Sequence, residues 1–74
     1  MEMIQTINVH NFKAIIDNWR ENPNMIPKKQ WLTFNRGLFL VIDNTKGKCV
    51  VHEFTNVDAA IAYSKESNAE WNNN

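Results

Sequence analysis

The first regular pattern of apolar and polar positions is a helical stripe near the N-terminus. Its apolar members are Val9, Phe12, Ile16 and Trp19. Intervals of three and four residues place side chains on one face of an amphipathic helix. We predict a helix over 9–21, with Thr6 or Asn8 as its N-cap. It ends before Pro23, because proline disfavours helical backbone in the residue that precedes it.

Three strand patterns follow, and two glycine-containing turns separate them. The predicted strands cover 29–34, 38–43 and 48–54. The first turn is Asn35-Arg36-Gly37 and the second is Asn44-Thr45-Lys46-Gly47. Each is typical of a hairpin that has glycine in the left-handed conformation, as in a type I turn followed by a bulge. Two such hairpins predict an antiparallel meander, and residues 1–6 either add a short edge strand or stay unpaired.

Three-residue loops set the register of these hairpins and so divide the strands into two faces. The predicted core face carries Leu32, Phe34, Leu38, Leu40, Ile42, Val50, His52 and Phe54. The predicted second face carries Trp31, Thr33, Phe39, Val41, Asp43, Cys49, Val51 and Glu53. A slip of one residue in the first hairpin would move Trp31 and Thr33 to the core face. That set is less apolar, so we prefer the first register.

A second helix is predicted over 56–66, after a capping box formed by Thr55 and Asp58. Its apolar stripe is narrow and made of small residues, which suits close packing on a sheet. The predicted fold class is α+β, in the order α-β-β-β-α, with both helices on one face of a three-stranded antiparallel meander. We expect one domain over 1–67 and a polar C-terminal tail over 68–74, in which Trp71 either folds back or is exposed.

Composition narrows the function classes. The chain has 74 residues, with eight basic and eight acidic residues that cancel. A neutral chain lacks the field of a typical nucleic-acid or membrane binder. A single cysteine, Cys49, excludes an internal disulfide, and no apolar run is long enough to span a membrane. With no signal peptide in evidence, we expect a cytoplasmic protein, and its many asparagines suggest a low-GC bacterial host.

Candidate catalytic or metal-binding residues are few. Cys49, His52 and Glu53 form a Cys-x-x-His-Glu sequence, but strand alternation turns His52 away from the other two. Two side chains cannot complete a zinc site, so we predict no metal. The only candidate bases, His10 and His52, have no nucleophile beside them. We therefore predict neither an enzyme nor a cofactor.

Two groups of residues are candidate binding sites. The first is the predicted partner-binding sheet face: Trp31, Phe39, Val41 and Val51. If the helices cover the other face, these residues form an exposed apolar patch of the kind that marks interfaces. The alternative is that the N-terminal segment or the Trp71 tail covers them. The second group is a patch for an anionic partner: Lys28, Lys29, Lys46 and Lys48, aided by Arg36 or Trp31. The alternative is that these lysines only protect a sheet edge and a turn.

The stretch from Gly37 to Ser64 resembles a strand–turn–strand–helix unit of short bacteriophage and mobile-element proteins. The element order is also similar to the double-stranded-RNA-binding domain, but the second helix opens with Asn56-Val57-Asp58-Ala59 and lacks that family's lysine cluster. In size and composition the chain resembles anti-CRISPR and other phage anti-defence proteins. This resemblance implies a stoichiometric inhibitor that blocks a host protein or nucleoprotein complex. A homodimer through the open sheet face and a nucleic-acid-binding module are the alternatives.

Overall fold

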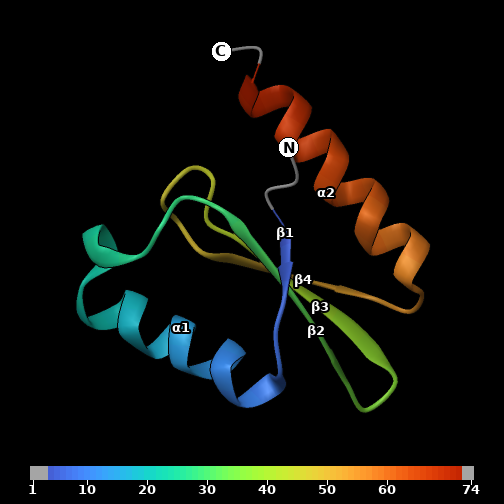
Figure 1. Ribbon diagram of the computed structural model, residues 1–74, viewed down its shortest axis with the longest axis horizontal. Coiled ribbons are helices and arrows are strands. Elements are labelled where there is room, and N and C mark those ends of the chain that lie inside the picture. Colours follow the sequence, from blue (N-terminus) through green and yellow to red (C-terminus); the bar gives the residue numbers. More distant parts are fainter. Residues whose placement is uncertain (1–3, 73–74) are drawn as a thin grey trace.

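A four-stranded sheet lies between two helices in the computed structural model of this chain (Figure 1). The structure describes the backbone of residues 4–72 and the side chains of residues 4–66. In chain order the elements are β1 (Ile4–Thr6), α1 (Val9–Glu21), the 3₁₀ turn η1 (Pro23–Met25), β2 (Gln30–Asn35), β3 (Leu38–Asp43), β4 (Val50–Phe54) and α2 (Val57–Asn72). The α+β class predicted from the sequence is confirmed.

Helix α1 forms where the apolar stripe predicts it. Asn8 is the N-cap, and its side-chain oxygen accepts a hydrogen bond of 2.8 Å from the backbone N–H of Asn11. The helix ends at Glu21, two residues before Pro23, which opens η1. Of its stripe, Phe12 is fully buried, so this side chain is the main apolar contact of α1 with the sheet.

The N-terminal segment forms a strand that changes the sheet from the predicted one. Strand β1 pairs in parallel with β2, and the sheet order is β1-β2-β3-β4. The backbone N–H of Ile7 extends this pairing by donating to the carbonyl of Leu32 at 2.9 Å. The three-stranded meander is therefore wrong in strand number, and of the two alternatives for residues 1–6 the short edge strand occurs. Helix α1 serves as a crossover that returns the chain beside its own start.

Both hairpins differ from their predicted register by one residue. Phe34 pairs with Phe39, and only Arg36 and Gly37 form the first turn, with φ angles of 52° and 81°. Two consecutive residues in the left-handed region are typical of a type I′ turn, which suits the twist of a two-residue hairpin. In the second hairpin Asp43 pairs with Val50 around a six-residue loop, Asn44 to Cys49, which we call the tip loop.

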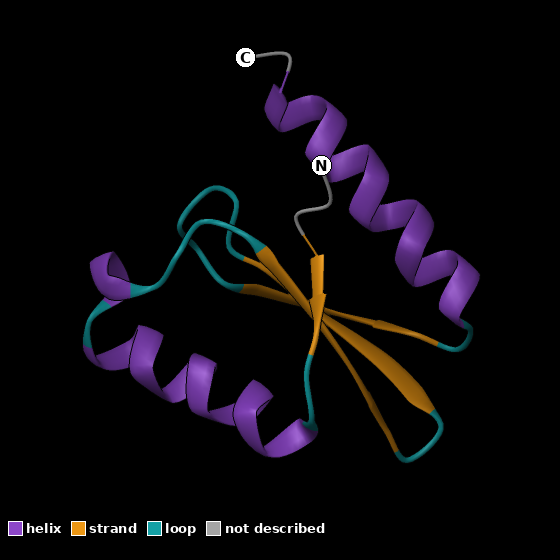
Figure 2. Ribbon diagram, in the orientation of Figure 1, coloured by secondary structure: helices purple, strands orange, loops and turns teal. Residues whose placement is uncertain are grey.

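The two helices lie on opposite faces of the sheet, as Figure 2 also shows, so the prediction of both helices on one face is wrong. The face beneath α1 carries Trp31, Thr33, Leu38, Leu40, Ile42, Val51 and Glu53. The face beneath α2 carries Gln30, Leu32, Phe34, Phe39, Val41, Asp43, Val50, His52 and Phe54. Our choice of register assumed one covered face and collected the most apolar residues there. Because both faces are covered, apolar content on one face does not identify the register. The first hairpin has the register that we rejected, with Trp31 and Thr33 on the same face as Leu40 and Ile42.

Helix α2 contacts the sheet through small and polar side chains and through the ring of Tyr63, which lies beside those of His52 and Phe54. Ala60 is fully buried, and the hydroxyl of Ser64 donates to Oε1 of Gln30 at 2.6 Å. The cap of this helix is Asn56 rather than Thr55, because the Asn56 side chain accepts from the N–H of Ala59 at 2.8 Å. The helix continues to Asn72, beyond its predicted end at 66. The expectation for Trp71 lies outside the described side chains.

Candidate functional site

Strand β4 is an edge of the sheet, and its outward backbone groups follow from the turn geometry. A two-residue turn is closed by a hydrogen-bonded pair, here Asn35 and Leu38, and such pairs alternate along the ladder. The backbone N–H and C=O groups of even-numbered residues of β3 therefore face β2, and those of odd-numbered residues face β4. The N–H of Asn44 donates to the Lys29 carbonyl at 3.0 Å, which agrees with this alternation.

The same alternation can be followed onto β4. Phe39, Val41 and Asp43 pair with Phe54, His52 and Val50. Those three residues of β4 therefore turn their backbone groups inward. It follows that Val51 and Glu53 direct their N–H and C=O groups away from the sheet, where no described strand pairs with them. We call these two residues the free edge.

A groove of about 530 Å³ runs beside the free edge on the face beneath α1. It exists because α1 packs mainly over β2 and leaves the β4 side of this face open. Its lining residues are Val9, Phe12, Lys13, Ile16, Asn35, Leu40, Val51, His52 and Glu53. Five of these nine residues are apolar, and the other four include two of opposite charge, Lys13 and Glu53.

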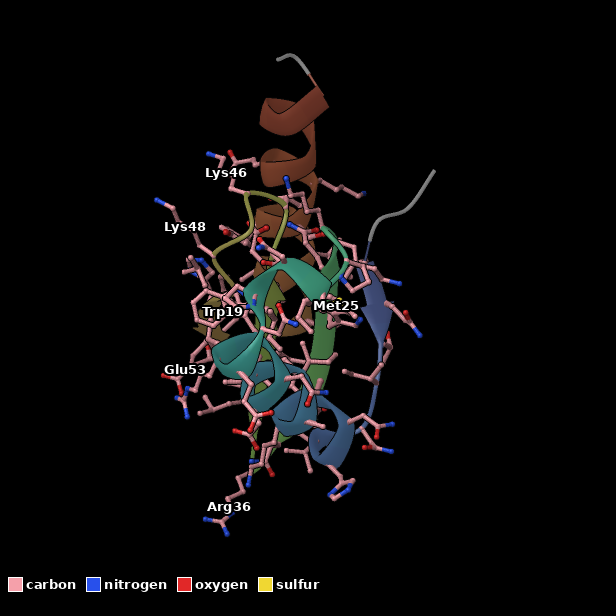
Figure 3. All side chains as sticks on the ribbon, turned by 90° about the vertical axis from the view of Figure 1, so that its left-hand side faces the viewer. Trp19, Met25, Arg36, Lys46, Lys48 and Glu53 are labelled. Atoms are coloured by element: carbon pink, nitrogen blue, oxygen red, sulfur yellow. The ribbon has the colours of Figure 1, made fainter. Side chains whose placement is uncertain are left out.

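The free edge and these two charges are accessible. Val51 is 43% exposed, and both Glu53 and Lys13 are exposed. Neither charge has an ion-pair partner among the described side chains, where the structure gives only the pair Arg20–Asp17. Figure 3 shows Glu53 pointing outward on the side of the molecule away from β1. This arrangement offers hydrogen-bonding backbone, apolar surface and unpaired charge at one place.

A second, polar cavity of about 240 Å³ lies between the tip loop and α2. Its lining residues are Asp43, Thr45, Lys46, Lys48, Val50, His52, Tyr63 and Glu66. The Tyr63 hydroxyl donates to Oδ2 of Asp43 at 2.7 Å and lies 2.9 Å from Nε2 of His52. Since that hydroxyl proton is used by Asp43, Nε2 of His52 is the donor in the second bond. These side chains satisfy one another's hydrogen-bonding groups, which suits a structural role better than proton transfer.

The tip loop that carries part of this cavity is fixed by one buried side chain. The Asn44 amide nitrogen donates to the carbonyls of Ile26 at 3.2 Å and Pro27 at 2.9 Å. Its oxygen accepts from the N–H of Cys49 at 3.1 Å. The indole of Trp19 also donates to the Gly47 carbonyl at 3.0 Å. The loop is therefore held to α1 and to the segment before β2.

The structure separates the predicted sheet-face patch. Trp31 and Val51 lie on the face beneath α1, whereas Phe39 and Val41 lie on the face beneath α2. Trp31 is 5% exposed and Val41 is fully buried. The four residues do not form one surface, because the one-residue shift in both hairpins changes the face of every strand partner. Val51 alone belongs to the groove, and sequence reasoning missed Glu53, Leu40 and Lys13.

The predicted lysine patch is partly assembled. Lys46 and Lys48 line the polar cavity, and Cε of Lys28 lies 3.9 Å from the position that a Cβ on Gly47 would take. Lys29 instead donates to Oε1 of Gln5 at 2.7 Å and lies 5.7 Å from the ring centre of Trp31. Arg36 sits at the opposite end of the sheet from Lys46 (Figure 3). Three of the five predicted cations are therefore brought together.

Cys49 has the features of a structural thiol. It is buried in the core cluster with Phe12, Trp31 and Ile42. Burial raises the pKa of its thiol to about 11, so the nucleophilic thiolate is scarce at neutral pH. Among the described residues no cluster of three His, Cys, Asp or Glu side chains could hold a metal ion. Cys49 therefore packs as part of the core beneath α1.

Comparisons of the chain with protein-family models, with curated proteins and with solved structures returned no match. Within the part of the chain that the structure describes, neither helix combines the length and the apolar character needed to cross a membrane.

Proposed function

We propose that this chain is a non-enzymatic protein-binding module that binds an extended segment of a partner as an additional strand beside β4. The observation that carries this proposal is the free edge of Val51 and Glu53 next to an apolar groove. Strand edges bind extended peptides through main-chain hydrogen bonds, and neighbouring pockets for alternate side chains give selectivity. Without an occupant, such an edge is a liability that proteins usually cover or block.

The side-chain chemistry supports binding rather than catalysis. In the polar cavity Tyr63 is hydrogen-bonded on both sides, to Asp43 and to His52. The only thiol, Cys49, is buried and holds its proton. A nucleophile needs a base within reach that is free to take its proton. These residues do not supply that pair.

Within this proposal, the biological role is that of a small phage or mobile-element inhibitor, of the anti-CRISPR or anti-defence type, acting in the cytoplasm of a bacterial host. Such a protein works by occupying a surface of a host protein or nucleoprotein complex. The free edge gives it a means to do so. A segment of about five residues, added along β4, would make the first contact.

The substitution Val51→Pro tests the binding mode. Proline removes the N–H of residue 51, which points outward, and leaves the inward hydrogen bonds of Val50 and His52 to β3 in place. Val50→Thr is the matched control, because Val50 is 45% exposed but its backbone groups face β3. We expect dodecapeptides selected on the full chain from a random display library to lose binding to Val51→Pro and to keep it with Val50→Thr. Selection that yields no peptides, or peptides that bind Val51→Pro equally, would refute the proposal.

A second candidate function is nucleic-acid binding at the tip loop. The observation in its favour is the group Lys28, Lys46 and Lys48, which have no ion-pair partners among the described residues. Counterion release would make such binding fall steeply with salt. Titration of duplex and single-stranded oligonucleotides at low ionic strength checks this. Binding that is lost in Lys46→Glu/Lys48→Glu supports it, and no binding at low salt excludes it.

A further inference from the structure

We propose that the strand added beside β4 runs antiparallel to it and carries the pattern basic–any–large apolar, read from its N-terminus. This inference rests on the proposed strand addition and names the partner segment that the same site selects. Three features of the site lead to it: the direction of the backbone groups of β4, the unpaired charge of Glu53, and the apolar groove beside Val51.

Backbone geometry sets the spacing of the pattern. In an antiparallel addition, the residues opposite Val51 and Glu53 exchange both backbone hydrogen bonds with them, and antiparallel pairing is slightly more stable than parallel pairing. Opposed residues share a face, so both partner side chains lie on the face beneath α1, next to the groove. Because the strands run in opposite directions, the residue opposite Glu53 comes two positions before the residue opposite Val51.

Glu53 selects the basic position. Its carboxylate is exposed and has no cationic partner among the described side chains. Opposite charges directly across two strands attract, whereas like charges there repel. A lysine or arginine opposite Glu53 supplies the missing partner, and an acidic residue at that position is disfavoured.

The groove selects the apolar position. Its apolar lining residues include Phe12 and Ile16 of α1 and Leu40 of β3, which pairs with Glu53 and lies diagonally across from Val51. A side chain opposite Val51 must lean over β4 to cover this surface, which favours long apolar residues such as leucine, methionine or phenylalanine. The middle residue points to the other face, beside His52, and is unrestricted.

Charge reversal at Glu53 tests the pattern. Dodecapeptides selected from a random display library on the full chain should carry basic–any–apolar, and selection on Glu53→Lys should yield an acidic residue at the same position. For a synthetic peptide pair that differs only by lysine or glutamate there, we expect about fivefold tighter binding of the lysine peptide, with the preference reversed on Glu53→Lys. Glu21→Lys, an equal charge change at an exposed residue of α1, should leave the preference unchanged.

The possible failures are distinguishable. If selected peptides lose binding to Val51→Pro but show no charge preference, or one that Glu53→Lys does not reverse, the pattern is refuted and strand addition stands. If the order of the pattern is apolar–any–basic, the antiparallel direction is refuted. If no peptide is selected, strand addition itself fails, and this inference fails with it.

Discussion

The two helices of this protein are attached to the same sheet by different kinds of contact. Helix α1 packs on a cluster of large apolar side chains, with Phe12, Trp31 and Ile42 at its centre. Helix α2 is attached through the fully buried Ala60, through the Tyr63 ring beside His52 and Phe54, and through hydrogen bonds of Tyr63 and Ser64. Burial of a large apolar side chain contributes about 1.5–3 kcal/mol, whereas a hydrogen bond contributes about 0.5–1.5 kcal/mol net. We therefore expect the α1 layer to hold the fold and the α2 layer to open first.

The largest expected effect is that of Phe12→Ala, which removes the buried anchor of α1. Phe12 is 2% exposed, and truncation of a buried phenylalanine costs about 3–5 kcal/mol. In a chain of 74 residues this loss is comparable with the whole stability. Urea denaturation measures it. Lys13→Ala, an exposed neighbour, should change stability by less than about 0.5 kcal/mol; a similarly small effect of Phe12→Ala would contradict the comparison.

The α1 layer should also weaken at alkaline pH through Cys49. Burial raises its folded-state pKa from 9.0 to about 11. The folded state therefore binds this proton more tightly than the unfolded state. Its contribution is complete below pH 9 and is lost as pH rises from 9 to 11, with on the order of 1 kcal/mol lost by pH 10. The free energy of unfolding at pH 8 and pH 10, compared between the native chain and Cys49→Ala, isolates this thiol; parallel pH profiles would show that it is not buried in solution.

The α2 layer should respond locally to Tyr63→Phe. This change removes the hydroxyl that joins Asp43 to His52 and keeps the ring, which lies 4.3 Å from that of His52. Because the cavity beside it admits water, we expect a loss of about 1 kcal/mol. Hydrogen exchange should accelerate in α2 and stay unchanged in α1. Equal acceleration in both helices would mean that the two layers open together.

The sequence predicted local structure better than the arrangement of layers. The bounds of α1 follow from its apolar spacing and from Pro23, which act within a few residues. The register depended on a global property, namely which faces are covered. Arg36 accepts a positive φ beside Gly37, and this shortens the first turn by one residue. Ranking the two faces by apolar content does not distinguish a two-residue turn from a three-residue turn, because both faces of the sheet are apolar at their centres.

The candidate site could be predicted only in part for the same reason. Val51 was selected as an interface residue, but its supposed neighbours Trp31 and Val41 are buried under different helices. No sequence pattern marks Glu53 as a binding residue. The signal that was available is topological: the last strand of a meander has a free edge unless something pairs with it. Which residues of β4 direct their backbone groups outward can be derived only once the two-residue turn at Arg36 and Gly37 is known.

The smallest expected effect concerns the most buried polar pair beneath α2. Gln30 is fully buried; its Oε1 accepts from Ser64, but its Nε2 has no hydrogen-bond partner among the described residues. Ser64→Ala alone should cost about 1 kcal/mol, because it leaves Oε1 without a donor as well. Gln30→Met alone should cost a similar amount, because the Ser64 hydroxyl then has no acceptor.

The double variant Gln30→Met/Ser64→Ala removes both partners and also the unpaired amide nitrogen. Replacing a buried polar pair by apolar groups of similar shape is often neutral or stabilising. We expect the double variant to lie within about 0.5 kcal/mol of the native chain, or above it, so that the two single losses do not add. Urea denaturation of the four proteins completes the cycle. Additive losses would mean that Gln30 and Ser64 stabilise the α2 layer independently, and that this layer depends less on paired hydrogen bonds than its contacts indicate.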